Sequence, residues 1–316
     1  MRYRILAREL PESALRRIAR EAVGGTLVRI EDADGDPHQV VHEVRKACTK
    51  IRALLRLFRP AFPEYSRENE FFRDIARTIA DLRDAASLVE CCDALAEGAR
   101  PGDGTTEAVA SVRVALLRRR EEVSSAIGIG DRLGAVHALL EEARERIAGW
   151  SLESQDLDTV AAGFSDGYRR ARKWIRRVSA EPTQENLHEW RKSVKVHRNH
   201  LRILRPVWPA VLGARHKRVK QLATRLGEEH DLAVLGEALH REPGRFDSEA
   251  VAILEEVMGS RRGELQDWAL PEGRRLFAEK PKRVRERMRK GWESWIRRFP
   301  SRTPLARSRD RPGLRR

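Results

Sequence analysis

The chain has 316 residues, of which 41% are hydrophobic, 35% charged and 6% aromatic. This length allows one large domain or two of ordinary size, and no apolar run approaches the ~20 residues of a membrane-spanning helix, which excludes that class. The formal net charge of +15 indicates a polyanionic partner, namely nucleic acid, an anionic membrane surface or a phosphate polymer.

Helical spacing of apolar residues dominates the chain, and no convincing run alternates as a strand does. In the first half we expect helices over residues 12–30, 42–59, 66–95, 107–126 and 133–147. An acidic turn at 31–37, prolines at 60 and 63, a loop at 98–106 and glycines at 128 and 130 separate them. The polar, acidic stretch 151–158 then marks a boundary between halves.

The second half repeats this order, with expected helices over 159–178, 188–205, 213–239, 247–265 and 281–298. The last two are joined by a stretch that contains proline and glycine. Residues 301–316 have almost no hydrophobic side chains, which predicts a disordered basic tail. We therefore expect an all-α fold of two duplicated helical bundles, 1–155 and 156–300, with short loops.

The cysteines indicate the compartment. Cys48, Cys91 and Cys92 form no Cys-x-x-Cys pair, and adjacent cysteines are poorly placed to bridge each other. Free thiols fit a reducing cytoplasm, and the first residues lack the apolar segment of a signal peptide. Cys48 lies near the apolar border of its helix, where we expect it to pack as a small hydrophobic residue.

The most informative feature is an internal repeat without gaps. The segment 42–60, HEVRKACTKIRALLRLFRP, returns at 188–206 as HEWRKSVKVHRNHLRILRP. The identical residues are His42/His188, Glu43/Glu189, Arg45/Arg191, Lys46/Lys192, Arg52/Arg198, Leu55/Leu201, Arg56/Arg202, Arg59/Arg205 and Pro60/Pro206. This pattern indicates a duplicated unit whose repeated element is a helix with a basic face.

At about 100° per residue, each repeated helix has an apolar half and a cationic half. In the first copy, Val44, Ile51 and Leu54 fall on the apolar half, and His42 falls near the centre of the cationic half. Most charged helix faces are simply solvated, but such faces usually mix signs because like charges one turn apart repel. Each face here carries a single acid, Glu43 or Glu189, which favours anion binding over a solvated face.

The pattern His-x-x-Arg-Lys with further cations on the same helix resembles the CHAD family, the conserved histidine α-helical domain. The family's following helix has a stretch like Leu-Gly-x-x-Arg/His-Asp, and this chain has LGEEHDLAVL at 226–235 and, without the glycine, IADLRDAASL at 79–88. The resemblance covers about residues 9–299. It implies two four-helix bundles around a positively charged cavity that binds inorganic polyphosphate, without catalysis and without a cofactor, often at polyphosphate granules.

Transferred position by position, the resemblance and the cationic faces give a set of expected polyphosphate-binding residues. They are His42, Arg45, Lys46, Lys50, Arg52, Arg56, Arg73, Arg77, Arg83, His188, Arg191, Lys192, Lys195, Arg198, Arg202, Lys217, Lys220, Arg225 and His230. The copies differ at one lysine, since Lys195 lies one position earlier in its repeat than Lys50. We also expect a bound anion to favour protonation of His42 and His188.

Several other functions compete with this interpretation. Non-specific nucleic-acid binding fits the charge, but the chain shows no recognised DNA-binding motif and few aromatic residues for base stacking. A polyphosphate-processing enzyme would use clustered carboxylates with magnesium. The available acids are Asp81, Asp84, Glu90, Glu228, Glu229 and Asp231, and we expect them to pair with nearby arginines instead. His197 and His200 share a helix face, yet without further ligands they predict packing rather than a metal site. A monomer and a homodimer both fit the sequence.

Overall fold

The computed structural model describes residues 3–7, 9–32, 36–98 and 104–298. Over these residues it contains eleven α-helices, two short 3₁₀ turns and no strand, which confirms the all-α prediction. The predicted basic tail at 301–316 lies outside the described residues. No helix among those described is long and apolar enough to span a membrane.

Six α-helices belong to the first half of the chain. They are α1 (Pro11–Glu31), α2 (Pro37–Phe58), α3 (Tyr65–Thr78), α4 (Ala80–Gly98), α5 (Thr105–Ile127) and α6 (Ile129–Ala148). The prediction of a single helix over 66–95 is wrong, because the helix is interrupted at Ile79, between α3 and α4. Neither proline nor glycine marks this break; Thr78 donates its hydroxyl to the carbonyl of Asp74, a local bond that competes with helix continuation.

The second half contributes α7 (Leu157–Ala180), α8 (Gln184–Leu204), α9 (Pro209–Arg241), α10 (Ser248–Leu276) and α11 (Pro281–Arg297). The helix expected to end near residue 265 continues to Leu276, through Pro271. Pro271 is exposed, so water can donate to the carbonyl that the proline, which has no amide hydrogen, leaves without a partner.

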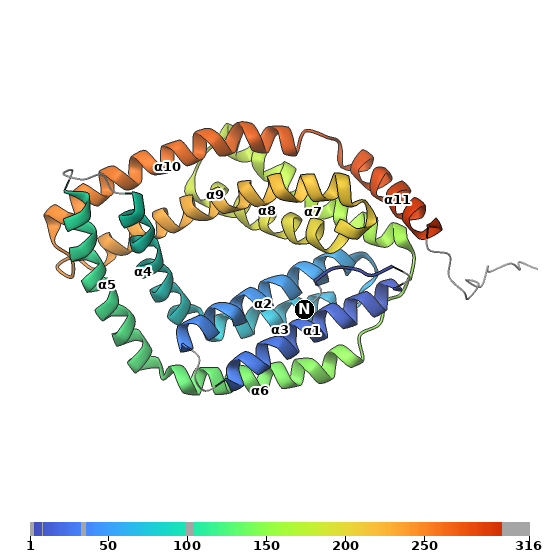
Figure 1. The fold of residues 1–316 in the computed structure, drawn as a ribbon, viewed down its shortest axis with the longest axis horizontal. Coiled ribbons are helices and arrows are strands. Elements are labelled where there is room, and N and C mark those ends of the chain that lie inside the picture. Colours follow the sequence, from blue (N-terminus) through green and yellow to red (C-terminus); the bar gives the residue numbers. More distant parts are fainter. Residues whose placement is uncertain (1–2, 8, 33–35, 99–103, 299–316) are drawn as a thin grey trace, which may run out of the picture.

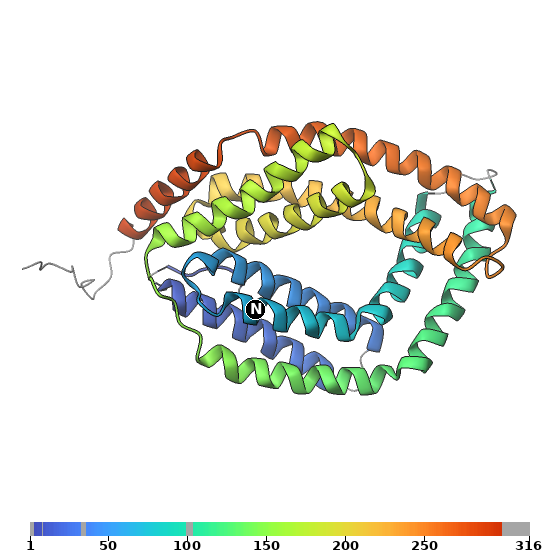
Figure 2. The ribbon, with the colours of Figure 1, turned by 180° about the vertical axis from the view of Figure 1, so that it is seen from behind.

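Each half of the chain packs its helices against one another. In the first half α1 packs on α2 and α6, and α4 packs on α5; in the second half α7 packs on α8 and α11, and α9 packs on α10. The halves meet where α2 contacts α8, α4 contacts α9 and α5 contacts α10. Figure 1 shows α2 and α8 in the middle of an elongated molecule, with α10 and α6 along its long edges. The reverse view keeps this order (Figure 2).

Two hydrophobic clusters hold the helices together, and each draws side chains from both halves. The larger includes Leu15 of α1, Ile51 of α2 and Trp190 of α8, while the smaller joins Cys92 of α4 to Leu235 of α9. The proposed division near residue 155 remains a prediction about the two repeats, which here pack directly against each other.

Candidate polyanion-binding surface

The sequence starts the two repeated helices with different caps and ends them alike. At α2, Asp36 accepts from the amide of His38 at 2.9 Å, and Pro37 supplies a fixed φ in the first turn. At α8, Thr183 accepts from the amide of Asn186. Both helices pass into a 3₁₀ turn with the sequence Arg-Pro, at Arg59–Ala61 and Arg205–Val207.

The apolar halves of both helices are buried as predicted. Val44, Ile51 and Leu54 of α2 are fully buried, and so are Trp190 and Val194 of α8. Burial of these side chains fixes the rotation of each helix, because turning it would expose them at a cost of about 1.5–3 kcal/mol each. The cationic halves are thereby held in a defined direction.

Each repeat holds its first arginine with an aspartate from the next part of the chain. Arg45 Nη1 lies 3.2 Å from Asp84 Oδ1 of α4, and Arg191 Nη2 lies 3.5 Å from Asp231 Oδ1 of α9. The aspartates occupy the same place in the IADLRD and LGEEHD segments. These pairs fix the guanidinium groups in direction while most of the surrounding charge stays positive.

The histidines show how the two half-sites differ. His188 Nδ1 lies 3.3 Å from His230 Nδ1, so one ring donates and the other accepts. In the first repeat Arg83 stands where His230 stands in the second, and it pairs with Glu90 at 2.7 Å. Burial and then the nearby Arg83 lower the pKa of His42, whereas burial followed by Lys192 lowers that of His188.

The two cationic helices converge. Burial lowers the pKa of Lys195 to about 8, and the positive charges of Arg191 and Arg198 on its own helix and of Arg45 on α2 act in the same direction. Burial likewise lowers the pKa of Arg191, which also feels Arg45. Burial raises the pKa of Asp231, and the charge of Glu90 on α4 adds to this effect. The same carboxylate partly opposes the lowering of the His42 pKa, so Glu90 lies near groups of both repeats.

Further along both helices, a second group of cations meets. Burial lowers the pKa of Lys50 of α2, and Arg198 and Arg202 of α8 contribute. Tyr3 joins the two helices here: its hydroxyl donates to the carbonyl of Lys50 at 2.7 Å, and Arg202 lies over its ring. Since Arg45 faces Lys195 and Lys50 faces Arg202, α2 and α8 run in the same direction.

The other predicted residues have different partners. Arg52 donates to Asn69 of α3. Burial lowers the pKa of Arg52, and the charges of Arg56 and Arg73 contribute in the same direction. Lys46 and Lys192 are exposed and pair with Glu43 and Glu189. Arg225 stacks on Trp268 of α10, and Arg77 pairs with Asp74 at the exposed surface. Lys217 and Lys220 are exposed on α9.

Sequence reasoning missed two members of this surface. Besides Tyr3, His216 of α9 belongs here: burial lowers its pKa, and the charges of Arg198 and Arg202 add to this effect. Tyr3 carries no motif, and only its isolation as an aromatic residue in a polar N-terminal segment marks it. The expected pairing of acids with arginines is confirmed for Asp84, Glu90, Glu228, Glu229 and Asp231.

Three side chains considered for other roles are packed in the interior. His197 is fully buried among Phe164, Tyr168 and Phe277, and burial holds its pKa well below the usual value. His200 donates from Nε2 to the carbonyl of Ala53 at 2.9 Å. Burial raises the pKa of Cys48 to about 12, as expected for a packed thiol.

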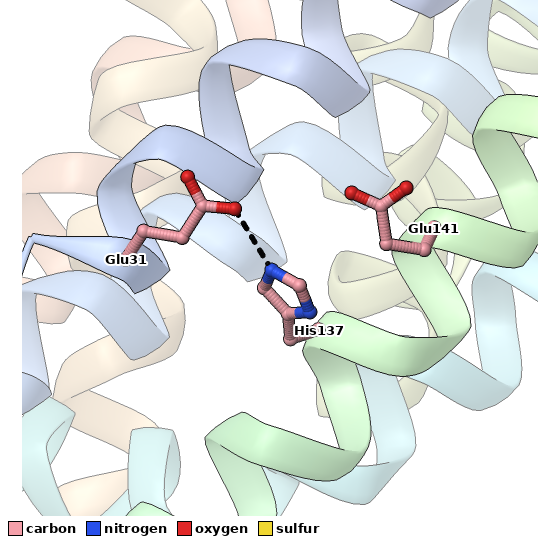
Figure 3. Close-up of side chains that lie close together, drawn as sticks. All are labelled: Glu31, His137 and Glu141. Atoms are coloured by element: carbon pink, nitrogen blue, oxygen red, sulfur yellow. Dashed lines mark hydrogen bonds and ion pairs between the residues drawn. The ribbon is translucent and has the colours of Figure 1, made fainter.

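One cluster of potential metal ligands lies elsewhere, where α1 meets α6. Glu31, His137 and Glu141 place their ligand atoms within 4.8 Å of one another (Figure 3). His137 Nε2 is 3.0 Å from Glu31 Oε1, and Glu31 is exposed. This contact is explained as a hydrogen bond between two helices at the surface.

The fold and this surface define a helical protein that brings together cations from two helices with a repeated sequence. The CHAD domain model matches residues 14–240, and the chain belongs to the CHAD family. The crystal structure of the CHAD domain from the plant Ricinus communis is similar, with a TM-score of 0.53 and 19% identity over 88% of this chain and 96% of that chain. At this identity the likeness concerns the fold alone. No curated protein matches the sequence.

Proposed function

We propose that this protein binds inorganic polyphosphate without catalysing a reaction on it. Its cations from α2, α4, α8 and α9 form the binding surface, with the two helical bundles arranged around a basic channel. The observation that carries the proposal is the contact between α2 and α8, which brings cations of both repeats together: Tyr3 donates to the carbonyl of Lys50 on α2 at 2.7 Å while Arg202 of α8 lies over its ring. Cations from separate halves are held together at an electrostatic cost that a bound polyanion would offset.

The chemistry of the surface suits a phosphate chain. Arginine presents a planar fork to two phosphate oxygens, and lysine supplies a mobile point charge. Polyphosphate has no bases, so it needs no aromatic platform, and the described aromatic rings near this surface are buried or covered, as Tyr3 is by Arg202. The acids Asp84, Glu90 and Asp231 bind arginines, which supports an ordering role for them rather than magnesium binding.

Binding of a fluorescent polyphosphate to the purified protein tests the proposal. The double variant Arg45→Ala/Arg191→Ala should lose at least tenfold in affinity, on the order of 1.5–3 kcal/mol for each charge-assisted contact. The variant Arg132→Ala/Arg144→Ala removes the same charge from exposed sites on α6 and should bind nearly as the parent does. Equal losses in both variants would reduce the effect to net charge and contradict a specific surface.

Two further measurements separate the competing functions. Polyphosphate should displace DNA completely while DNA displaces polyphosphate poorly; the reverse order would favour nucleic-acid binding. Release of phosphate on incubation with magnesium would indicate an enzyme.

The proposal also includes where the protein acts and in what form: in the cytoplasm, at polyphosphate granules, as a monomer or homodimer.

A further inference from the structure

A second cationic surface lies on the outer side of α7, in a segment that the repeat does not include. Over residues 169–177 the sequence RRARKWIRR has six cations and no acid. Phe164, Tyr168, Ala171 and Ile175 form the buried side of this helix. At 100° per residue, Arg169, Lys173 and Arg176 fall on the opposite side, and all three are exposed.

These cations line a groove whose other wall is the segment before α11, which hydrogen bonds to α7 hold in place. A groove of about 460 Å³ is bounded by Arg169, Arg172, Lys173, Arg176 and Pro281. Three side chains of α7 fasten the wall. Ser165 donates to the carbonyl of Pro281 at 2.8 Å, Tyr168 donates to that of Glu279 at 3.0 Å, and Arg172 donates to that of Phe277 at 3.1 Å.

The positive charge of the groove is poorly compensated. Asp166 pairs with Arg169, but no carboxylate among the described residues pairs with Arg172, Lys173 or Arg176. Glu279 belongs to the wall, yet its carboxylate is engaged by Arg287 on α11. Unlike most exposed helix faces, which mix signs, this one therefore holds three cations around a concave surface, Arg172, Lys173 and Arg176, that pair with no carboxylate of the described residues.

The groove is separate from the surface on α2 and α8. The opposite side of α7 packs against α8, where Phe164 and Tyr168 contact the buried His197. A ligand in the groove is thus divided from the convergent cations of α2 and α8 by a packed layer. Two separated cationic surfaces on one molecule allow two segments of polyanion to be held at once.

We infer that the α7 groove is a second anion-binding site that takes a segment of a phosphate chain. This inference rests on the proposed function for the identity of its ligand. Arginine and lysine can contact phosphate oxygens along the groove, whereas a nucleic acid would also need surfaces for its bases. Trp174 on the same helix is half-buried, with Lys173 and Arg177 near its ring. A protein with two such sites can bridge phosphate chains.

The test uses the full chain, with tripolyphosphate as the probe for counting sites and long polyphosphate for bridging. Arg169→Ala/Lys173→Ala/Arg176→Ala removes the groove cations but keeps Arg172, which fastens the wall. Its matched control, Arg118→Ala/Arg132→Ala/Arg144→Ala, removes the same charge from exposed positions of α5 and α6. Calorimetry gives the stoichiometry, and light scattering with long polyphosphate reports bridging.

We expect the groove variant to fall from two bound tripolyphosphates to one and to lose bridging, while the control keeps both. Unchanged stoichiometry in the groove variant would overturn the inference. The variant Arg45→Ala/Arg191→Ala distinguishes failure of this inference from failure of the proposed function. If this variant loses all tripolyphosphate binding, the groove is not a site, and the α2–α8 proposal stands. If it binds with normal affinity and only the groove variant loses binding, the α2–α8 proposal is refuted and the groove stands. Displacement of the groove-bound probe by single-stranded RNA but not by polyphosphate would overturn the ligand assignment.

Discussion

Histidine in a cationic surface is the residue-scale feature that links structure to binding. Burial and neighbouring cations lower the pKa of both His42 and His188 in the free protein, so both rings are largely neutral at pH 7. The contact between His188 and His230 keeps these two rings from being protonated together, and burial with the charge of Arg191 lowers the pKa of His230 to about 3. A bound phosphate reverses part of this effect, because it favours the charged form.

We therefore predict that polyphosphate binding takes up protons. Since the anion raises the pKa of His42 and His188 from values below the usual one, affinity should increase as pH falls from about 7 towards those free-state values. The charged groups that face His42 are Arg83, Glu90, Glu43 and Lys46; those that face His188 are Lys192, Arg191, Glu189, Lys195 and the ring of His230. Binding isotherms in buffers of different ionisation enthalpy measure the uptake. His42→Ala/His188→Ala should flatten the pH dependence; an unchanged profile would remove the histidines from the site.

A different histidine should control stability in acid. His200 is fully buried, and burial lowers its pKa to about 4, while the unfolded chain keeps a value near 6.5. The neutral, buried ring therefore contributes about 3 kcal/mol to the free energy of unfolding. This contribution is fully present above about pH 6.5 and is lost as pH falls to about 4. Urea unfolding at several pH values in this range gives the free energy of unfolding as a function of pH. This free energy should change less with pH in His200→Gln, whose amide can still donate to the carbonyl of Ala53. The exposed His240→Gln serves as the control; equal slopes in all three proteins would contradict the assignment.

At the scale of elements, glycines let α7 approach its neighbours. A Cβ at Gly163 would lie 1.9 Å from the carbonyl oxygen of Leu57 in α2, and one at Gly167 would lie 2.6 Å from His200. Both obstacles belong to the fully buried core, so neither can move freely. This close contact between α7 and α2 ties the second half of the chain to the first.

Gly163→Ala should therefore destabilise the fold by about 1–3 kcal/mol, because α7 must shift away from α2. Gly134→Ala on α6 is the matched control, since its Cβ would meet nothing within 4 Å. In a helix interior that change should stabilise by up to about 1 kcal/mol. Thermal unfolding of both variants measures the difference, and a neutral Gly163→Ala would mean that the α2–α7 contact adjusts without cost.

The helices and their buried sides follow from the sequence because apolar spacing and Pro/Gly breaks are local signals. Val44 and Trp190 were predicted on the buried faces and are fully buried. The break at Ile79 is marked only by the bond from the Thr78 hydroxyl to Asp74, and α10 continues through Pro271 because this residue is exposed; both depend on the folded structure, which the sequence pattern does not record. For the same reason the repeat identified Arg45 and Arg191 but not Tyr3, whose place between α2 and α8 results from tertiary contacts alone.

At the scale of the whole molecule, the contacts between the two halves place like charges next to each other. Their repulsion lowers the free energy of unfolding, and a bound polyanion can relieve it. Arg45 of the first half and Arg191 and Lys195 of the second are held together by the packing of α2 on α8 and of α4 on α9. Salt screens such repulsion between exposed groups but acts less on buried ones. The free protein should thus be less stable than the same fold would be without this repulsion, and polyphosphate should stabilise it most at low ionic strength.

Lys195→Met tests this opposition between stability and binding. Burial lowers the pKa of Lys195 to about 8 against 10.5 in the unfolded chain, so the charged lysine disfavours folding below pH 8 by up to about 3 kcal/mol, a cost that disappears as pH rises to 10.5. Methionine keeps most of the aliphatic length, so the variant should melt at a higher temperature at pH 7 yet show a smaller rise in Tm when polyphosphate is added. Lys192→Met, at the exposed and paired neighbour, should change the free Tm little. A Lys195 variant that melts lower than the parent, or keeps its full response to polyphosphate, would show that the convergent charges neither oppose folding nor serve the ligand.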